Sequence, residues 1–152
     1  MYYKKAGAWT ELQSDLASLE GGSRGGLRGS STPFVANGYV RGVHSEMQLV
    51  APSELKISVA DDTAASEFQL LHLHTQSDRR TFRSATDEGL KTFGPSSDAV
   101  KFKAKEVAPK TYLLSLPALT LGEYGLLAPY SGEATSSSRQ SRRLYTFRVV
   151  KE

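Results

Sequence analysis

Short stretches in which apolar and polar residues alternate are the main pattern along the chain, and they predict β-strands. The clearest are 55–60 (LKISVA) and 100–107 (VKFKAKEV), where every second residue is apolar at the start of the run. Successive side chains of a strand point to opposite faces, so each segment is expected to bury one face only. The three lysines of 100–107 would then face solvent, where they discourage pairing with another sheet edge. The inward positions are Leu55, Ile57 and Val59, and Val100, Phe102 and Ala104.

Further strand-forming runs follow one another with little space between them. They are 2–5, 9–12, 34–43, 46–50, 67–75, 80–84, 111–116, 124–127 and 144–150. The run 67–75 is apolar on part of both faces, which is typical of a strand in the middle of a sheet. In 144–150, Tyr145, Phe147 and Val149 share one face. We therefore expect about eight to ten strands, as in a β-sandwich or barrel.

Turns are marked by glycine. Gly7 separates 2–5 from 9–12 and predicts a short hairpin. Asn37-Gly38 lies inside 34–43, and this dipeptide favours either a tight hairpin or a bulge within one long strand. The residues 76–79 are expected to close a second hairpin between 67–75 and 80–84.

One segment has helical spacing instead. Leu12, Leu16 and Leu19 recur at intervals of three to four residues around 13–20. We expect at most one short helix there, or a loop whose leucines rest on the core.

Leu119, Gly122 and Tyr124 form a pattern that resembles the L-x-P-G-x-Y sequence of a tyrosine corner. In such a corner a Tyr near the start of a strand donates its hydroxyl to backbone a few residues upstream. Gly122 would take the positive φ of the turn without a Cβ clash. Leu121 stands where the pattern usually has Pro, and the alternative is an ordinary glycine turn. Tyrosine corners occur in Greek-key sandwiches, so the expected fold is an all-β, immunoglobulin-like β-sandwich.

Length and composition fit one domain. The 152 residues are enough for a single core, and we expect residues 1–152 to form one unit. The Gly-rich segment 21–32 and the Ser-rich segment 131–141 predict a flexible loop and a polar loop.

No cysteine is present, which excludes disulfides, a thiolate nucleophile and zinc–thiolate sites. No run is long enough to span a membrane, and no apolar region follows Met1 as in a signal peptide. We therefore expect a mature or excised domain whose natural start was removed and replaced by Met1.

Charge adds little to this picture. The sequence has 19 basic and 16 acidic residues, a net charge of +3, so we do not expect nucleic acid as a partner. Basic residues are dense only at Arg79-Arg80 and at Arg142-Arg143. A weak polyanion site there would lose affinity steeply with added salt.

His72 and His74 are the candidate metal ligands. Residues two apart on a strand face the same way, so both imidazoles could reach one ion, and a metal-dependent hydrolase is one alternative function. A third ligand is required, and nothing in the sequence brings His44 or an aspartate near. No nucleophile elbow or other catalytic pattern is present, so we expect neither an enzyme nor a cofactor.

Exposed aromatic residues are the candidate contacts for a carbohydrate. Trp9 is the only tryptophan, and we assign it to a ligand-binding set with Tyr39, Arg79 and Arg80. A carbohydrate-binding accessory domain is therefore a second alternative. An exposed Trp9 beside other rings would favour it, whereas a buried Trp9 would be a core residue.

The segments YYKKAGAWTEL, EFQLLHLHTQSDRRTFR and APKTYLLSLPALTLGEYGLLAP are similar to an uncharacterised domain of bacterial secreted or envelope proteins. The resemblance covers most of residues 1–130 and carries over no catalytic residue. It implies a periplasmic, cell-surface or secreted location. The leading expectation is a non-catalytic binding or structural module of a bacterial exported or envelope-associated protein. Its partner would be another protein or domain of the same parent assembly.

Overall fold

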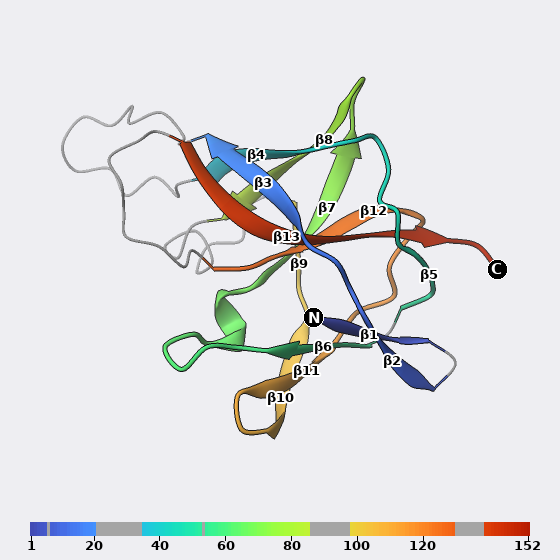
Figure 1. Cartoon of the computed structure of the whole chain (residues 1–152). Helices are drawn as coiled ribbons and strands as arrows, with labels where there is room; N and C mark the ends of the chain where they lie inside the picture. The colour runs from blue at the N-terminus through green and yellow to red at the C-terminus, as the bar shows by residue number, and fades with distance from the viewer. Residues whose placement is uncertain (6, 21–34, 53, 86–97, 130–138) are drawn as a thin grey trace.

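The computed structural model describes residues 1–5, 7–20, 35–52, 54–85, 98–129 and 139–152, and it is all-β (Figure 1). Apart from one 3-10 turn, η1 (Ala65–Glu67), every regular element in these ranges is a strand. None of the described segments is a helix long and apolar enough to cross a membrane. The Gly-rich segment 21–32 and residues 131–138 of the predicted polar loop lie outside the described residues.

Six strands close into a barrel. Their order around the ring is β12 (Gly122–Leu127), β13 (Arg139–Val150), β3 (Asp15–Glu20), β4 (Val35–Arg41), β8 (Arg79–Ala85) and β7 (Gln69–Thr75). Closure comes from β7, which pairs with β8 at one end and with β12 along most of its length. Two short strands extend this sheet: β5 (Gln48–Val50) runs parallel to the end of β13, and β9 (Ala99–Val100) pairs with β7.

A second, five-stranded antiparallel sheet lies below the barrel in Figure 1. Its order is β10 (Lys103–Ala108), β11 (Thr111–Ser115), β6 (Glu54–Ser58), β1 (Tyr2–Lys5) and β2 (Ala8–Glu11). Its inner face packs against the outside of β7, β12 and β13, whereas the opposite side of the barrel, made by β4 and β8, is not covered by it.

The molecule has two apolar cores because β7, β12 and β13 bury residues on both faces. The barrel interior contains Ala17, Leu19, Val40, Leu71, Leu73, Phe82, Leu127 and Leu144. The layer between barrel and sheet contains Tyr3, Leu12, Leu49, Leu55, Ile57, Ala65, Phe68, Leu70, Leu114, Tyr124, Leu126, Phe147 and Val149. The prediction that 67–75 forms a central strand is confirmed, since Leu70 and Leu71 point into different cores.

The all-β class is confirmed, but the Greek-key sandwich is not, because a closed barrel is present where two open sheets were expected. The hydrogen bonding of β12 explains the difference. Tyr124 is opposite Phe147 of β13 on one side and His72 of β7 on the other. β12 and β7 stand at opposite ends of the strand order β12-β13-β3-β4-β8-β7. Their direct pairing therefore closes the sheet into a ring.

The predicted helix at 13–20 is wrong, and this segment contains β3. Ala17 and Leu19 point into the barrel with exposed fractions of 0% and 5%, whereas Leu16 is 68% exposed. The burial period is therefore two residues. The helical spacing was misleading because Leu12 belongs to the other core, before the strand begins.

Asn37-Gly38 forms neither the hairpin nor the bulge that its sequence suggested. Strand β4 passes straight through it, and its register with β8 is continuous from Val35, opposite Ala85, to Arg41, opposite Arg79. Gly38 has a packing role instead, because Phe82 fills the space where its side chain would be.

The other predicted hairpins are confirmed. β1 and β2 meet at Gly7, whose φ is +85°, and β7 and β8 are joined by residues 76–78. The run 100–107 is divided between β9 and β10. Val100 and Phe102 pack against the core as expected, but Ala104 is exposed because β10 is the outermost strand of its sheet.

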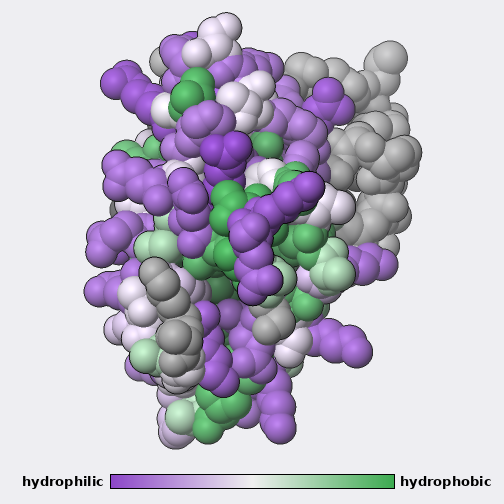
Figure 2. Space-filling view, turned by 90° about the vertical axis from the view of Figure 1, so that its right-hand side faces the viewer, coloured by the Kyte–Doolittle hydropathy of each residue, from purple (hydrophilic) through white to green (hydrophobic). Residues whose placement is uncertain are grey.

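The side of the molecule on which β13 ends shows apolar residues gathered within a hydrophilic surface (Figure 2). Val50 and Leu121 are 50% and 53% exposed. Leu121 also lines a shallow pocket of about 300 Å³ with Val149 and Val150. Apolar side chains at the end of β5 and just before β12 are thus exposed to solvent.

Candidate functional site

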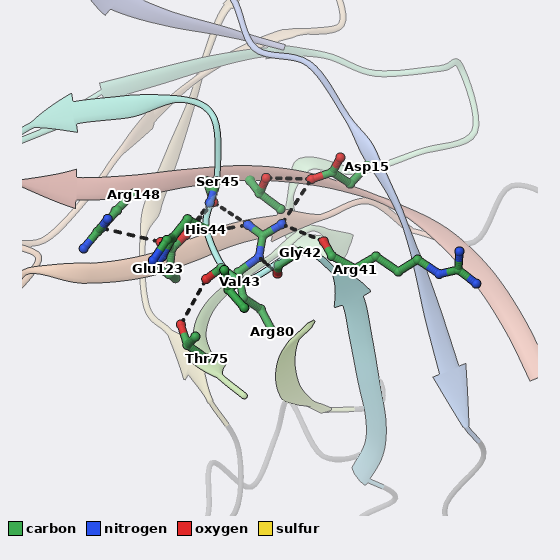
Figure 3. Close-up of polar contacts among 11 residues, drawn as sticks. Asp15, Arg41, Gly42, Val43, His44, Ser45, Thr75, Arg80, Glu123 and Arg148 are labelled. Carbon is green, nitrogen blue, oxygen red and sulfur yellow. Dashed lines mark hydrogen bonds and ion pairs between the residues drawn. The ribbon is translucent and has the colours of Figure 1, made fainter. Parts of the chain in front are cut away.

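Arg80 is buried at one end of the barrel, with its side chain 2% exposed (Figure 3). Its Nε donates a hydrogen bond to the carbonyl oxygen of Gly42 (3.0 Å), and Nη2 donates to that of Arg41 (3.2 Å). Nη2 also lies 3.6 Å from Asp15 Oδ2, and Nη1 lies 3.6 Å from Glu123 Oε2. The sequence assigned Arg80 to a ligand set, but the structure places its guanidinium inside the fold.

Glu123 is the anionic counterpart of Arg80, and its side chain is 5% exposed. Its Oε2 accepts hydrogen bonds from the backbone nitrogen (2.9 Å) and the hydroxyl (2.6 Å) of Ser45. Its Oε1 lies 3.1 Å from His44 Nδ1 and 3.6 Å from Arg148 Nε. The segment between β4 and β5 is therefore tied across the barrel end by a buried carboxylate. Sequence reasoning missed this network, because nothing local marks Glu123 or Ser45 as buried.

All three histidines of the sequence line one pocket of about 310 Å³ next to this network. His72 and His74 lie on the same face of β7, as predicted, with ring centroids 4.9 Å apart. His44 reaches the pocket from the segment that crosses the barrel end, a convergence that the sequence did not indicate. The remaining lining residues are Leu73, Thr75, Gly122, Glu123 and Arg148.

His72 is the most enclosed of the three. Its ring meets that of Tyr124 edge-on at 5.1 Å between centroids. A Cβ on Gly122 would come within 3.1 Å of His72 Nε2, so glycine at this position makes room for the imidazole. Burial lowers the pKa of His72, the nearby His74 lowers it further, and Asp98 acts in the opposite direction.

Asp98 holds the other side of the site together. Its Oδ1 lies 2.7 Å from His74 Nε2, and its Oδ2 accepts a hydrogen bond from the backbone nitrogen of Arg83 (2.7 Å). Its own backbone nitrogen donates to the Arg83 carbonyl (3.1 Å), and its carbonyl accepts from the backbone nitrogen of His72 (2.9 Å). Asp98 thereby links β7 to β8.

The geometry gives no support to a metal centre. Within the described ranges, no three or more His, Asp, Glu or Cys side chains are arranged so that they could hold an ion. His44 is directed at Glu123 and His74 at Asp98.

A second and larger pocket, of about 630 Å³, lies on the open side of the barrel and shares His74 with the first. Register places Tyr39, Thr81 and His74 side by side on β4, β8 and β7. The guanidinium carbon of Arg79 lies 4.9 Å from the centre of the Tyr39 ring, and Arg79 also pairs with Asp78 at 2.9 Å. The other lining residues are Asn37, Gly38, Gln76, Phe82, Arg83 and Asp98. Tyr39 and Arg79, which the sequence assigned to ligand binding, are thus brought together.

Trp9 lies elsewhere, on the outer face of the five-stranded sheet. It is partly exposed, and Lys56 Nζ lies 4.5 Å from its ring centre and 5.4 Å from that of Tyr2. Lys4 Nζ is 5.9 Å from the same Trp9 ring. The fold does not bring Trp9 to Tyr39, and lysine side chains lie over its ring.

The residues of the predicted tyrosine corner lie at the start of β12: Leu119 precedes the strand, Gly122 begins it and Tyr124 is within it. Tyr124 is 3% exposed, and its hydroxyl lies 3.1 Å from Thr120 Oγ1, a side chain four residues upstream. Gly122 has φ +156°, and Leu119 packs against the core between the layers. The Tyr124 hydroxyl therefore contacts a side chain, where the motif predicts a backbone acceptor.

The arginines of the predicted polyanion site are not gathered on one surface. Arg80 is buried, and Arg79 lies at the larger pocket. Arg142 Nε donates to the carbonyl oxygen of Ala128 (2.7 Å), and Arg142 lines a different pocket with Arg143 and Leu16. Arg79 and Arg80 thus have separate surroundings, and Arg142 and Arg143 lie together at another pocket.

Comparison with known proteins gives no relative from which a role could be transferred. No family model matches the chain, and neither a curated protein nor a solved structure matches it significantly.

Proposed function

We propose that the chain is a non-catalytic binding module, and that its ligand site is the larger pocket around Tyr39, Arg79 and His74. The observation that carries this proposal is the Tyr39–Arg79 stack, at 4.9 Å, on the wall of a polar pocket of about 630 Å³. Pockets of this size suit small ligands. The expected setting is still an exported or envelope-associated bacterial protein, and an immunoglobulin-like origin remains a prediction from the Tyr124 motif alone.

The hydrogen bonds already accepted by the carboxylates beside the pockets support a binding role over catalysis. The carboxylates beside the pockets already accept several hydrogen bonds: Glu123 from Ser45 and Asp98 from the Arg83 backbone. A general base needs a free lone pair directed at a substrate proton. The two carboxylates that hold histidines therefore act as structural anchors, and turnover of any substrate by the purified chain would overturn the non-catalytic assignment.

The lining of the pocket favours a ligand rich in hydroxyl groups, such as a sugar. Asn37 and Gln76 supply amides that both donate and accept, and Thr81 and Tyr39 supply hydroxyls. The stacked Arg79 and Tyr39 add a flat surface and further donors. This composition agrees with the carbohydrate-binding alternative but moves the expected site from Trp9 to Tyr39. Trp9 is partly exposed near Tyr2, but it is the weaker candidate, because it lies on the outer face of the five-stranded sheet and not in the pocket that Tyr39 lines.

The proposal is tested by glycan-array screening followed by calorimetry on the best ligand. We expect Tyr39→Ala and Arg79→Ala each to weaken binding about tenfold or more, because each removes half of the stacked wall. Trp9→Ala is the matched control and should leave affinity unchanged. If Trp9→Ala abolishes binding and Tyr39→Ala does not, the site lies on the five-stranded sheet instead.

A contact with another protein is the remaining part of the proposal. The exposed Val50 and Leu121 are the apolar contacts that we expect for a neighbouring domain of the same parent assembly.

Metal analysis of the purified chain tests the hydrolase alternative, for which stoichiometric zinc or another transition metal would be required.

A further inference from the structure

We propose that the outer face of the five-stranded sheet binds an acidic polysaccharide in which charged and neutral sugars alternate. This site goes beyond the proposed function, because it lies apart from the pocket that Tyr39 lines and selects its ligand by charge. Tyr39 is on β4 of the barrel, whereas the outer face is made by β10, β11, β6, β1 and β2, the lower sheet of Figure 1. The two sites can therefore be tested separately.

The register of the strands places one row of side chains across this face. Residues directly opposite each other on antiparallel strands point to the same side of a sheet. Lys105 is opposite Leu113, Leu113 is opposite Lys56, and Lys56 is opposite Tyr2. Leu55, the neighbour of Lys56 in β6, is fully buried against the barrel. The row that contains Lys56 therefore faces outward.

A second row lies beside the first. Lys103 is opposite Ser115, and Ser115 is opposite Glu54. At the other end of the sheet, Lys4 is opposite Trp9. Lys4 Nζ lies 3.8 Å from Glu54 Oε2, so these two side chains meet on the same face. The two rows thus gather lysines from β10, β6 and β1, which are far apart in the sequence.

This face is cationic, although the net charge of the whole chain is only +3. Its outward side chains include more cations than anions: Lys4, Lys56, Lys103 and Lys105 against Glu11 and Glu54. Glu54 is paired with Lys4. Within the described ranges, no carboxylate lies at ion-pair distance from the other three lysines. Their charges are therefore available to an anionic partner.

Two aromatic rings hold Lys56 in place on this face. Its Nζ lies 4.5 Å from the centre of the Trp9 ring and 5.4 Å from that of the Tyr2 ring. The negative face of an aromatic ring attracts an ammonium group at such distances. An ammonium group that is already positioned loses less conformational freedom when an anion binds to it. A carboxylate can therefore bind Lys56 without displacing it from the rings.

The arrangement of the lysines and rings favours a polysaccharide over a nucleic acid. Lys105 and Lys56 are two strands apart, a separation of about 10 Å. An acidic polysaccharide with neutral sugars between its carboxylates has widely spaced charges, whereas a single-stranded nucleic acid has a phosphate on every nucleotide. Bases also stack on open ring faces, and here the ammonium group of Lys56 lies over both Trp9 and Tyr2.

Oligosaccharides of equal length provide the probes. Hexasaccharides of hyaluronan and of unsulfated chondroitin have a carboxylate on every second sugar, and chitohexaose is uncharged. Trp9 is the only tryptophan of the chain, so tryptophan fluorescence reports binding at this face directly. We expect at least one acidic hexasaccharide to change the emission, and chitohexaose to leave it unchanged. Raising sodium chloride from about 50 mM to about 200 mM should weaken this binding about tenfold.

Variants of the lysines locate the site. Lys56→Gln should weaken binding about tenfold, the loss expected when one charged hydrogen bond is removed. The double variant Lys103→Gln/Lys105→Gln should cause a loss of at least this size, because it removes the cations at the other end of the rows. Lys151→Gln is the matched control, since Lys151 is an exposed lysine at the pocket beside Leu121, and it should keep full affinity.

Three results would overturn the inference. If neither acidic hexasaccharide changes the emission of Trp9, this face is not a polysaccharide site, whether or not a neutral sugar binds at the larger pocket. If oligothymidylate binds more tightly than both hexasaccharides and Lys56→Gln weakens it, the face binds single-stranded nucleic acid instead. If Tyr39→Ala abolishes binding of the acidic hexasaccharides and Lys56→Gln does not, they bind in the larger pocket, and the proposed function stands alone.

Discussion

The ring of Phe82 lies directly on Gly38 of the neighbouring strand inside the barrel. The two residues are paired across β4 and β8, and a Cβ on Gly38 would come within 2.3 Å of Phe82 Cζ and 2.4 Å of Cε2. Phe82 is 2% exposed and has Leu19, Val40 and Leu73 in the same core. The glycine is therefore part of the packing of the barrel interior.

Gly38→Ala should destabilise the protein by about 1–3 kcal/mol, because the added methyl group forces the Phe82 ring out of its place. Urea unfolding followed by circular dichroism measures this loss. The double variant Gly38→Ala/Phe82→Leu should lose less unfolding free energy than the two single variants lose together, since the smaller leucine side chain leaves room for the methyl group. Wild-type stability in Gly38→Ala would mean that Phe82 does not cover this position.

Arg80→Met should cost about 3–5 kcal/mol, because it removes the buried cationic partner of Glu123 and leaves beside this carboxylate the more exposed guanidinium of Arg148. Glu123 keeps hydrogen bonds from Ser45, which do not neutralise its charge. The matched variant is Arg80→Met/Glu123→Gln, which removes both charges and should recover a measurable part of the loss in the same unfolding assay. An equal loss in the single and double variants would show that Arg80 stabilises the barrel end through its backbone hydrogen bonds instead.

Tyr124→Phe should reduce stability by about 0.5–1.5 kcal/mol, the usual net value of one hydrogen bond. The partner of the hydroxyl is Thr120, which is itself exposed, so no acceptor is left stranded in the core. Thr120→Val should cause a similar loss, and combining the two changes should add little. A loss well above this range in Tyr124→Phe alone would indicate that the hydroxyl also hydrogen-bonds to a backbone group, as in a true tyrosine corner.

Stability should fall as the solution is acidified through the range in which His72 titrates. Burial holds the pKa of His72 in the folded protein below its ordinary value of 6.5. The unfolded chain therefore takes up a proton first, so unfolding is favoured as the pH drops below about 6.5 and until the folded-state pKa is reached. Above this window the group has no effect on stability.

Unfolding midpoints measured from about pH 8 to about pH 5 test this dependence. His72→Gln should flatten the profile across the window, because glutamine does not titrate. NMR titration of the His72 ring provides an independent check, and a midpoint at or above 6.5 in the folded protein would contradict the expected sign.

Much of the secondary structure was predictable because its signals are local. Alternation in 55–60 identified β6, and Gly7 located the first hairpin. The apolar character of both faces of 67–75 marked β7 as a central strand, and the same-face placement of His72 and His74 followed from strand geometry. These inferences hold because a strand's period and a turn's φ angles depend on neighbouring residues only.

The errors came where tertiary contacts override a local pattern. Leucine spacing around 13–20 suggested a helix, but hydrogen bonding to β13 and β4 makes β3 a strand. Asn37-Gly38 has the composition of a turn, yet it lies within a strand, and the ring of Phe82 occupies the space where a side chain of residue 38 would lie. The intrinsic conformational preference of a few residues contributes less free energy than the burial of a core side chain. Tertiary packing therefore determines the backbone conformation at these positions.

The sequence by itself determined an all-β chain, most of its strands and which of their faces are apolar. Only the tertiary structure decided that β12 pairs with β7 to close a barrel, that Arg80 and Glu123 are buried together, and that His44 meets His72 and His74. The physical reason is separation along the chain. Alternating polarity says which face of a strand is buried, but the partner of each edge is chosen by the packing of the whole molecule. Sites assembled from distant strands depend on that choice, and so does the function of this protein.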